Sequence, residues 1–406
     1  MPRLLLLLPA AGYANQDFIA AAARLNIELV ACADYCHRLA PGWGLPPLMS
    51  VPFDQPDLAL PLVLHGLKQP VDAVLAVDDH GLALAARLRE ALGFPGNSPE
   101  AVATLSDKLR FRQLQQAIGL PHPAFAKVDA DALEAAVAPG FPLVVKARRL
   151  NASRGVIRAD DADQLARALR QVQRIQARVQ RDQDDLLVER FIPGVEVALD
   201  GVLSNGALRV LAVFDKPDPL DGPYFEETLF ITPSRLPHAT QRELADAVER
   251  ACVAAGVTDG VIHAEARINA AGVCLLEIAP RGIGGLCGRV LAATLGMGTA
   301  EIVLRHAVGL PLPEQTNDTA AGVMMIPIPA GGIFHGVDGL ESARAVPHIT
   351  GIEITAQPGQ LVAPPPDGAG YLGFIFSRAA TPGEAEAALR VAHAALALCI
   401  QPLVEP

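Results

Sequence analysis

The sequence has no apolar segment of membrane-spanning length and no surplus of basic residues. Its leucine run at residues 4–8 is five residues long, whereas a transmembrane helix needs about 20 apolar residues. The run ends at Pro9 and no cleavage-like region follows, so we expect a buried parallel strand rather than a signal sequence. The net charge of −11, from 33 Lys and Arg against 44 Asp and Glu, argues against nucleic acid as a partner. We therefore expect a cytoplasmic protein without membrane or nucleic acid partners.

Cysteine is also scarce, with six residues scattered through expected strands and helices at positions 32, 36, 252, 274, 287 and 399. Cys32 and Cys36 lie near His37 but have no second pair of ligands, so core cysteines with reduced thiols are favoured over a zinc site. No GxGxxG motif follows the first expected strand, which weakens a dinucleotide-binding interpretation. A chain of 406 residues exceeds one ordinary core, so two or three domains are expected.

The first elements indicate a doubly wound α/β domain at the start of the chain. A strand, helix, strand, strand and helix are expected at residues 3–9, 15–25, 27–34, 72–77 and 81–92. This alternation predicts a parallel sheet, whose ligands bind beyond the carboxyl ends of its strands. Asp78 and Asp79 follow the strand at 72–77, so they are candidates for contact with a ligand, although surface loop positions would explain them equally.

The rest of the chain mixes strands and helices with one long loop. Further strands are expected at residues 141–147, 186–191, 196–203 and 208–214. Further helices are expected at residues 106–118, 163–181, 240–255 and 384–398. Thr240 and Glu243 fit a capping box at the start of the third of these helices. The loop at 215–233 is rich in Pro, Asp, Glu and Phe, and connections this long are usually functional or disordered.

The segment HAEARINAAGVCLLEIAPR, residues 263–281, alternates as a β-hairpin. His263, Glu265 and Arg267 share one face of the first strand, and Ile262, Ala264, Ala266 and Ile268 share the other. In the second strand Glu277 faces away from Cys274, Leu276 and Ile278. A pairing of residue 268 with 274 keeps both apolar faces together, and it places Glu265 directly opposite Glu277.

Two carboxylates opposed in a sheet repel unless positive charge lies near them. Mg²⁺ satisfies this need, because it prefers one or two carboxylates together with substrate phosphate oxygens. The pair therefore suggests a site for a metal and a nucleotide. The alternative is a solvated sheet face that happens to carry two glutamates.

Five motifs occur in a fixed order, and the hairpin acids are the last of them. They are SDKLRFRQLQQAIGLPHP with Lys108, FPLVVKA with Lys146, the loop NASRGV, VERFIPGVE with Glu189 and Glu196, and Glu265 with Glu277. Each motif alone is weak, but their order over about residues 1–315 resembles the ATP-grasp superfamily. The resemblance implies an N-terminal α/β domain at 1–104, an ATP-grasp domain at 105–315 with a mobile lid at about 120–190, and a C-terminal α+β domain at 316–406.

The same resemblance implies ATP as the cofactor. The residues expected to bind it are Lys108, Lys146, Ser153, Arg154, Gly155, Glu189, Ile192 and Glu196. The two lysines would neutralise the α- and β-phosphates, and the backbone of the loop would close over the β- and γ-phosphates. The first acid, with the backbone to residue 192, would face the adenine, and the second acid would face the ribose.

Glu265 and Glu277 are expected to hold Mg²⁺ or Mn²⁺. Arg281 is expected to stabilise an acyl phosphate and then the oxyanion formed on amine attack. The family usually has Asn two residues after the second metal acid, and this chain has Ala279 there. A second metal ion would therefore be held less fully, or by water.

Within the superfamily, the chain resembles the bacterial L-amino acid ligases that form dipeptides. The segments that carry this resemblance are DKPDPLDGPYFEETLFITPSRL, HAEARI and GYLGFIFSRAATPGEAEAALR. It implies a carboxylate–amine ligase with small-molecule substrates, and a homodimer by analogy. Residues expected at the substrates are Glu226, Glu227, His263, Gly284 and Gly285. The alternatives are a biotin-carboxylase-like or purine-pathway ligase that uses bicarbonate or formate, and a sensor that binds ATP without catalysis.

Overall fold

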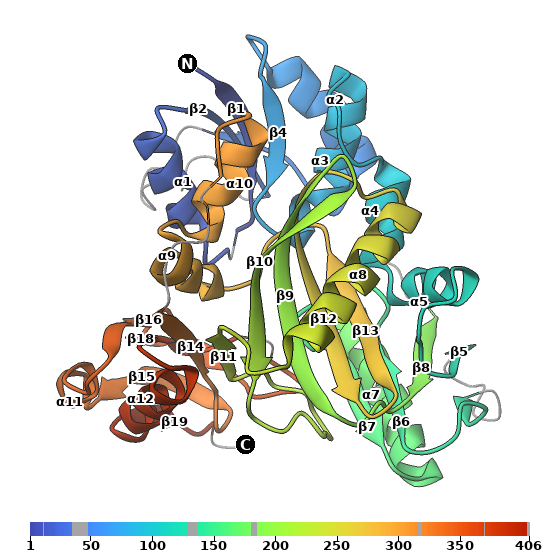
Figure 1. Cartoon of the computed structure of the whole chain (residues 1–406), viewed down its shortest axis with the longest axis vertical. Coiled ribbons are helices and arrows are strands. Elements are labelled where there is room, and N and C mark those ends of the chain that lie inside the picture. The colour runs from blue at the N-terminus through green and yellow to red at the C-terminus, as the bar shows by residue number, and fades with distance from the viewer. Residues whose placement is uncertain are drawn as a thin grey trace.

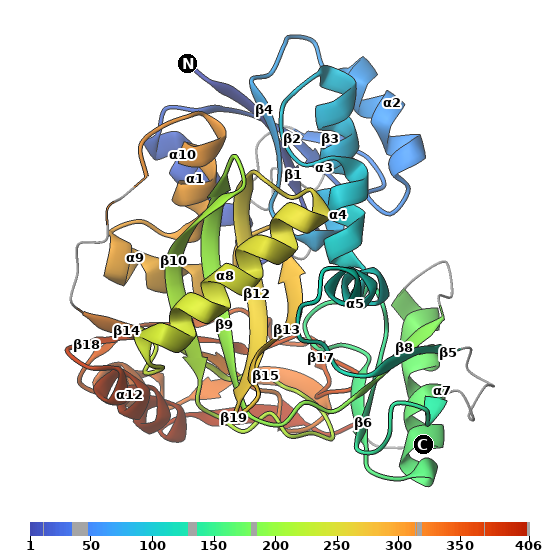
Figure 2. The same ribbon diagram turned by 45° about the vertical axis from the view of Figure 1, so that its right-hand side comes forward.

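The computed structural model describes residues 1–10, 12–34, 48–128, 136–179, 185–312, 314, 319–368 and 370–403. Cys36 and His37, which were considered for zinc, lie outside these residues. The described residues form an N-terminal α/β part, a central part with a projecting small sheet, and a C-terminal α+β part (Figures 1 and 2). Among them, no single helix is long and apolar enough to cross a bilayer, and one pair of short helices at 287–295 and 299–307, bent by 78°, meets that test only jointly.

The N-terminal part is built on a parallel sheet, as the strand–helix alternation predicted. Its strands are β1 (Arg3–Leu8), β2 (Glu28–Ala33), β3 (Leu48–Ser50) and β4 (Ala73–Ala76). Their order is β3-β2-β1-β4, with every neighbouring pair parallel. The helices are α1 (Asn15–Arg24), α2 (Pro56–Gly66), α3 (Asp79–Leu92) and α4 (Pro99–Ser106). The leucines of β1 pack alternately into two different core clusters, which confirms the run as a buried strand.

An eight-stranded antiparallel sheet occupies the centre, in the order β13-β12-β9-β10-β11-β14-β18-β16. Its strands are β9 (Val195–Ser204), β10 (Ala207–Lys216), β11 (Leu229–Thr232), β12 (Gly260–Asn269), β13 (Gly272–Ala279), β14 (Ala320–Ile326), β16 (Ile349–Ile354) and β18 (Gly373–Ala379). Helix α8 (His238–Ala255) covers one face, as Figure 1 shows. The short helices η2 (Cys287–Arg289) and α9 (Val290–Leu295) cover the other face. Helix α10 (Thr299–Ala307) packs on α1 and so joins the centre to the N-terminal part.

The small projecting sheet follows helix α5 (Lys108–Ala117) and has the order β5-β8-β6-β7. Its strands are β5 (Phe125–Val128), β6 (Leu143–Lys146), β7 (Val156–Ala159) and β8 (Leu186–Arg190). Helix α7 (Ala162–Val179) covers this sheet with the predicted stripe of Leu165, Leu169 and Val172. Val179, also assigned to that stripe, is exposed instead. The small sheet therefore has a core of its own.

The C-terminal part extends the central sheet and adds a second, smaller one. The small sheet has the order β17-β15-β19, with β15 (Gly332–Asp338), β17 (Leu361–Val362) and β19 (Ala397–Gln401). The helices are α11 (Leu340–Arg344) and α12 (Pro382–Ala394). The helix expected at 384–398 thus ends at Ala394, because the residues after it pair with β15.

Two local predictions were wrong because tertiary contacts decide these positions. Helix α8 begins after Pro237 without a side-chain cap, and Glu243 instead accepts a hydrogen bond from the backbone N–H of Val273 at 3.3 Å. The loop expected at 215–233 contains β11, which pairs with β14 about ninety residues later. A strand with so distant a partner has no local turn signal to reveal it.

The hairpin of β12 and β13 confirms the predicted facing of Glu265 and Glu277, but by a different register. Glu265 pairs with Glu277, whereas Ile268 pairs with Val273 rather than with Cys274. A bulge follows Glu265 in the ladder, so Leu275 takes the core position that alternation gave to Leu276. Leu276 lines the same cavity as the two glutamates.

A buried ion pair fixes α5 to the small sheet. Arg112 on α5 is fully buried, and its Nε donates to Oε2 of Glu189 on β8 at 2.8 Å. Lys146 on β6 contacts the other oxygen of Glu189. Burial alone would raise the pKa of Glu189, but the charges of Arg112 and Lys146 lower it to about 2. This carboxylate therefore stays ionised and depends on both cations.

We expect Arg112→Met to lower the free energy of unfolding by about 3–5 kcal/mol, because it leaves a buried carboxylate short of one cation. Arg110→Met on the same helix breaks only the exposed pair with Glu100, so it should cost less than about 1 kcal/mol. Urea denaturation at neutral pH measures both changes. Equal unfolding midpoints for the two variants would contradict the expectation.

Candidate active site

A cavity of about 500 Å³ lies where the N-terminal part, the small sheet, the central sheet and the C-terminal part meet. The volume lies within the range of ordinary ligand pockets. Its lining includes Asp79 from the first part, Lys146 from the small sheet, Glu265 from the centre and Tyr371 from the C-terminal part. A ligand in this cavity would therefore touch all parts of the molecule.

Most of the predicted site residues line this one cavity. They are Lys108, Lys146, Ser153, Arg154, Glu189, Ile192, Glu196, Glu227, His263, Glu265, Glu277, Arg281, Gly284 and Gly285. Gly155 does not line it and faces the core of the small sheet, where an added Cβ would lie 3.0 Å from Cβ of Ala147. Glu226 does not line it either, and its Oε1 is buried without a hydrogen-bond partner among the described residues.

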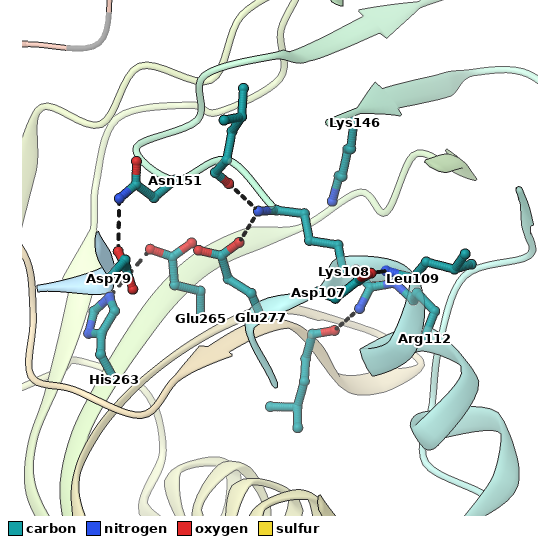
Figure 3. A network of polar contacts seen from close by, with 12 residues as sticks. Asp79, Asp107, Lys108, Leu109, Arg112, Lys146, Asn151, His263, Glu265 and Glu277 are labelled. Atoms are coloured by element: carbon teal, nitrogen blue, oxygen red, sulfur yellow. Dashed lines mark hydrogen bonds and ion pairs between the residues drawn. The ribbon is translucent and has the colours of Figure 1, made fainter. Parts of the chain in front are cut away.

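Each of the two opposed glutamates pairs with a lysine from outside the hairpin. Glu277 lies 3.2 Å from Nζ of Lys108, which also donates to the backbone oxygen of Leu150 at 2.6 Å. Glu265 lies 3.0 Å from Nζ of Lys216. Figure 3 shows the two carboxylates side by side, with Lys108 reaching Glu277 from helix α5. The positive charge that the opposed acids require is thus supplied by ammonium groups from two other elements.

Lys216 was not found from the sequence, although it pairs with three acids that line the cavity. It is the last residue of β10, and its ammonium contacts Glu196, Glu227 and Glu265. One oxygen from each of these acids lies within 4.8 Å of the others. Glu265 and the opposed Glu277 both offer carboxylate oxygens, which are hard ligands of the kind that Mg²⁺ takes. The residues present therefore fit such an ion.

The acids expected at the adenine and ribose are both engaged within the protein. The oxygens of Glu189 contact Arg112 and Lys146. Glu196 accepts from Nζ of Lys216 and from Nε of Arg267, each at 2.9 Å. Burial lowers the pKa of Lys146, and the pairing with Glu189 opposes that shift. Arg267 also lies over the ring of Phe191, so this wall is fixed by charge and by cation–π contact.

The loop between β6 and β7 adopts a left-handed backbone at Ala152, Ser153 and Gly155, with φ of 52°, 53° and 69°. The backbone N–H groups of Arg154 and Val156 donate to Asn151 and Ser153 within the loop. Two of the N–H groups expected to close over the phosphates are thus engaged within the loop in this conformation. Nε of Arg154 is buried at the cavity without a partner, so this side chain has donor capacity left for a ligand.

His263 forms a charged bridge between two acids. Its Nδ1 lies 2.7 Å from Oδ1 of Asp200, and its Nε2 lies 3.4 Å from Oε1 of Glu265. Burial alone would lower the pKa of His263, but the hydrogen bonds to Asp200 and Glu265 raise it to about 9. Asp200, fully buried on β9, was not predicted, because nothing in the sequence near it indicates its partner on β12.

Arg281 is held by a residue from the N-terminal part. Its Nε and Nη2 donate to the two oxygens of Asp79 at 2.8 and 2.7 Å. The guanidinium and the carboxylate are therefore paired in the planar, two-bond manner that favours Arg over Lys. Position after a parallel strand is the signal that had marked Asp79 as a candidate.

The end of the cavity near the C-terminal part is more apolar. Met325, Tyr371 and Cys287 line it together with Glu227. Burial, followed by repulsion from Glu265, raises the pKa of Glu227 to about 8, although Lys216 opposes the shift. This end of the cavity can therefore accept a ligand that carries an ammonium group next to an uncharged side chain.

Comparisons with known proteins agree with this geometry. Residues 139–290 match the family model of the ATP-grasp domain, and residues 324–400 match L-amino acid ligase C-terminal domain 2. An L-amino acid ligase from Bacillus licheniformis has a similar structure, with a TM-score of 0.82, 25% identity and 99% of each chain covered.

Two curated relatives match over part of their length. Carnosine synthase 1 of Gallus gallus is 31% identical over 66% of this chain and 32% of that protein. D-alanine–D-alanine ligase of Pseudomonas putida (strain GB-1) is 33% identical over 42% of this chain and 53% of that protein. The chain thus spans about a third of the first relative and about half of the second. The chain belongs to the ATP-grasp superfamily, and it joins an ATP-grasp domain to a C-terminal domain of the L-amino acid ligases.

Proposed function

We propose that the protein is an ATP-dependent carboxylate–amine ligase that joins amino acids or similar molecules and forms ADP and phosphate. The observation that carries the proposal is the opposed pair of Glu265 and Glu277 in a cavity that also holds Lys108, Lys146 and Arg281. The end-to-end similarity to an L-amino acid ligase supports the same activity.

The reaction would proceed in two steps. A carboxylate oxygen attacks the γ-phosphorus of ATP, and the bond between that phosphorus and the leaving oxygen of ADP breaks. The amine nitrogen then attacks the acyl carbon, and the bond from that carbon to phosphate breaks. The substrate ammonium loses one proton before the attack and a second as the amide forms.

The nucleotide would lie between the small sheet and the hairpin. In this proposal Lys108 and Lys146 contact the phosphates, and Ser153 and Arg154 close over them from the loop. The backbone of residues 189–192 borders the adenine. Glu196, already paired with Lys216 and Arg267, has both oxygens engaged and would accept the ribose hydroxyls as additional donors.

Glu265 and Glu277 would hold Mg²⁺ or Mn²⁺, which neutralises phosphate charge when bound. Their lysines offset the repulsion between the two carboxylates before that. Ala279 lies across the ladder from His263 and offers no ligand oxygen. The protein residues therefore support one metal ion more fully than two.

Arg281 would donate to the acyl phosphate and then to the oxyanion of the tetrahedral intermediate. Glu227 and His263 would face the substrates, with the ammonium of one of them near Glu227. Gly284 leaves room beside Arg281 for the reacting atoms, because a Cβ added there would come no closer than 3.9 Å to Nη1 of Arg281. Gly285 also lines the cavity, although a Cβ added there would meet the ring of Phe374. The position of Glu226 outside the cavity lining removes it from this set.

We expect phosphate release from Mg–ATP only when an acid and an amine are both present. The assay incubates the protein with ATP and amino acids, singly and in pairs, and measures phosphate and the mass of the product. Release with bicarbonate or formate alone would instead favour a biotin-carboxylase-like or purine-pathway activity. ATP binding without turnover under any pairing would favour a sensor and reject the ligase.

We expect Glu277→Gln to raise the Mg²⁺ concentration needed for half-maximal turnover by at least about tenfold, because a neutral amide is a weaker ligand than a carboxylate. Magnesium titrations of turnover at saturating ATP measure the effect. Glu100→Gln, at an exposed position on α4, is the matched control and should not change the titration. Identical titrations for the two variants would exclude Glu277 as a metal ligand.

We expect Glu227→Gln to raise the KM of one amino acid substrate by about 10- to 100-fold, because a hydrogen bond to a charged group contributes about 1.5–3 kcal/mol. The dissociation constant of the nucleotide should change little. Glu226→Gln, one residue away and outside the cavity lining, should leave this KM within about twofold. Steady-state kinetics with each substrate varied separately decides the matter, and an unchanged KM in Glu227→Gln would remove the residue from the substrate site.

A further inference from the structure

Asp79 stands at a junction of three parts of the molecule. It is the first residue of α3, directly beyond the strand β4 of the N-terminal sheet. Its Oδ1 accepts from Nε of Arg281 at 2.8 Å, and its Oδ2 accepts from Nη2 of Arg281 at 2.7 Å. The same Oδ2 accepts from Nδ2 of Asn151, on the loop of the small sheet, at 2.9 Å (Figure 3).

The pair is more than a surface ion pair. The exposed fractions of the Arg281 and Asp79 side chains are 15% and 27%, so solvent screens them only partly. Burial would raise the pKa of Asp79, but the charge and hydrogen bonds of Arg281, together with Asn151, lower it to about 2. The carboxylate is therefore ionised at any working pH, and it fixes the plane of the guanidinium.

Some N–H groups of Arg281 remain available to a ligand after its pairing with Asp79. A guanidinium has five N–H groups, and Nε and Nη2 each use one on Asp79. Nη1 uses one on the backbone oxygen of Gly282 at 2.8 Å. Two N–H groups remain, one on each terminal nitrogen. A Cβ added at Gly284 would have Nη1 as its nearest neighbour, 3.9 Å away, so that side of the guanidinium is open toward the cavity.

We propose that Asp79 is the positioning residue for Arg281, and that its hydrogen bond from Asn151 links the orientation of Arg281 to the position of the phosphate loop. This inference rests on the proposed ligase function. Asp79 does not touch the reacting atoms. It orients two N–H groups of Arg281 toward the place where oxyanion charge develops, and such donors act only when their direction is set in advance. The loop that closes over ATP would thereby help to align the arginine.

The test removes the charge of Asp79 while keeping the shape of its side chain. Asp79→Asn retains one oxygen acceptor but replaces the other oxygen with an NH₂ donor. It therefore cannot accept the parallel hydrogen bonds from Nε and Nη2 of Arg281 on two separate oxygens. We expect kcat to fall about 10- to 100-fold, while the KM for ATP and the dissociation constant of a non-hydrolysable ATP analogue change less than about threefold. Asp79→Glu restores the charge and should recover part of the lost kcat, which a purely structural role would not predict.

The matched control is Glu90→Gln on the same helix. Glu90 is exposed and does not line the cavity, so this variant removes one carboxylate of α3 away from the site. This variant should keep kcat within about twofold. If Asp79→Asn also keeps kcat within twofold, or if it loses nucleotide affinity in proportion to kcat, the positioning role is wrong.

Two further outcomes separate this inference from the proposed function. A wild-type protein that turns over no acid and amine pair rejects the ligase itself, whatever Asp79 does. If Asp79→Asn does not fold, Asn151→Ala tests the link, because it removes only the hydrogen bond from the loop to Asp79. That variant should lower kcat by about two- to tenfold with less change in nucleotide affinity, and an unchanged kcat would overturn the link between loop and arginine.

Discussion

The structure depends on cations that offset the charges of closely spaced carboxylates in one cavity. Glu265 and Glu277 face each other across a ladder, where like charges destabilise the pairing. Lys216 and Lys108 compensate that repulsion, and each comes from an element other than the hairpin. Because a buried charge is tolerated only with a partner, the hairpin can carry its acids only when β10 and α5 are in place.

The need to pair charged side chains also explains why the cavity lies where the parts of the molecule meet. The small sheet has its own core and its own helix, yet its two charged wall residues, Glu189 and Lys146, are neutralised together with Arg112 from α5. The N-terminal sheet has a core of its own on one face and shares the core on its other face with α10, and its Asp79 pairs with Arg281 beyond the hairpin. Apolar packing therefore builds the parts and joins some of them, while ion pairs set which charged side chains face the cavity. Such pairs can be exchanged for contacts with a charged ligand at lower cost than apolar contacts can be broken.

Alternation and element order were enough to predict the parallel N-terminal sheet and the facing of Glu265 and Glu277. Both depend on local periodicity, which a strand imposes on its own residues. The bulge after Glu265 shows the limit of that reasoning. The alternation pattern predicted the correct pair of acids but assigned the wrong leucine to the core. Leu275 and Leu276 are equally apolar, and only packing against α8 distinguishes them. The strand β11 was missed and a capping box on α8 was wrongly predicted, because tertiary contacts decide both positions.

The pairing of residues with distant partners could not be predicted from the sequence, even where one or both residues had been named as candidates. Lys216 ends a strand in a segment that read as an acidic loop, and its three acids come from β9, from β12 and from the chain just before β11. Asp79 and Arg281 are separated by 202 residues, and each alone is an ordinary charged residue at the end of a strand. They meet because parallel strands present their carboxyl ends at one edge of a sheet, and the end of the hairpin lies beside that edge. The chemistry of the cavity therefore depends on pairs of residues that are distant in the sequence. Each pair can be identified only once the fold has brought its two members together.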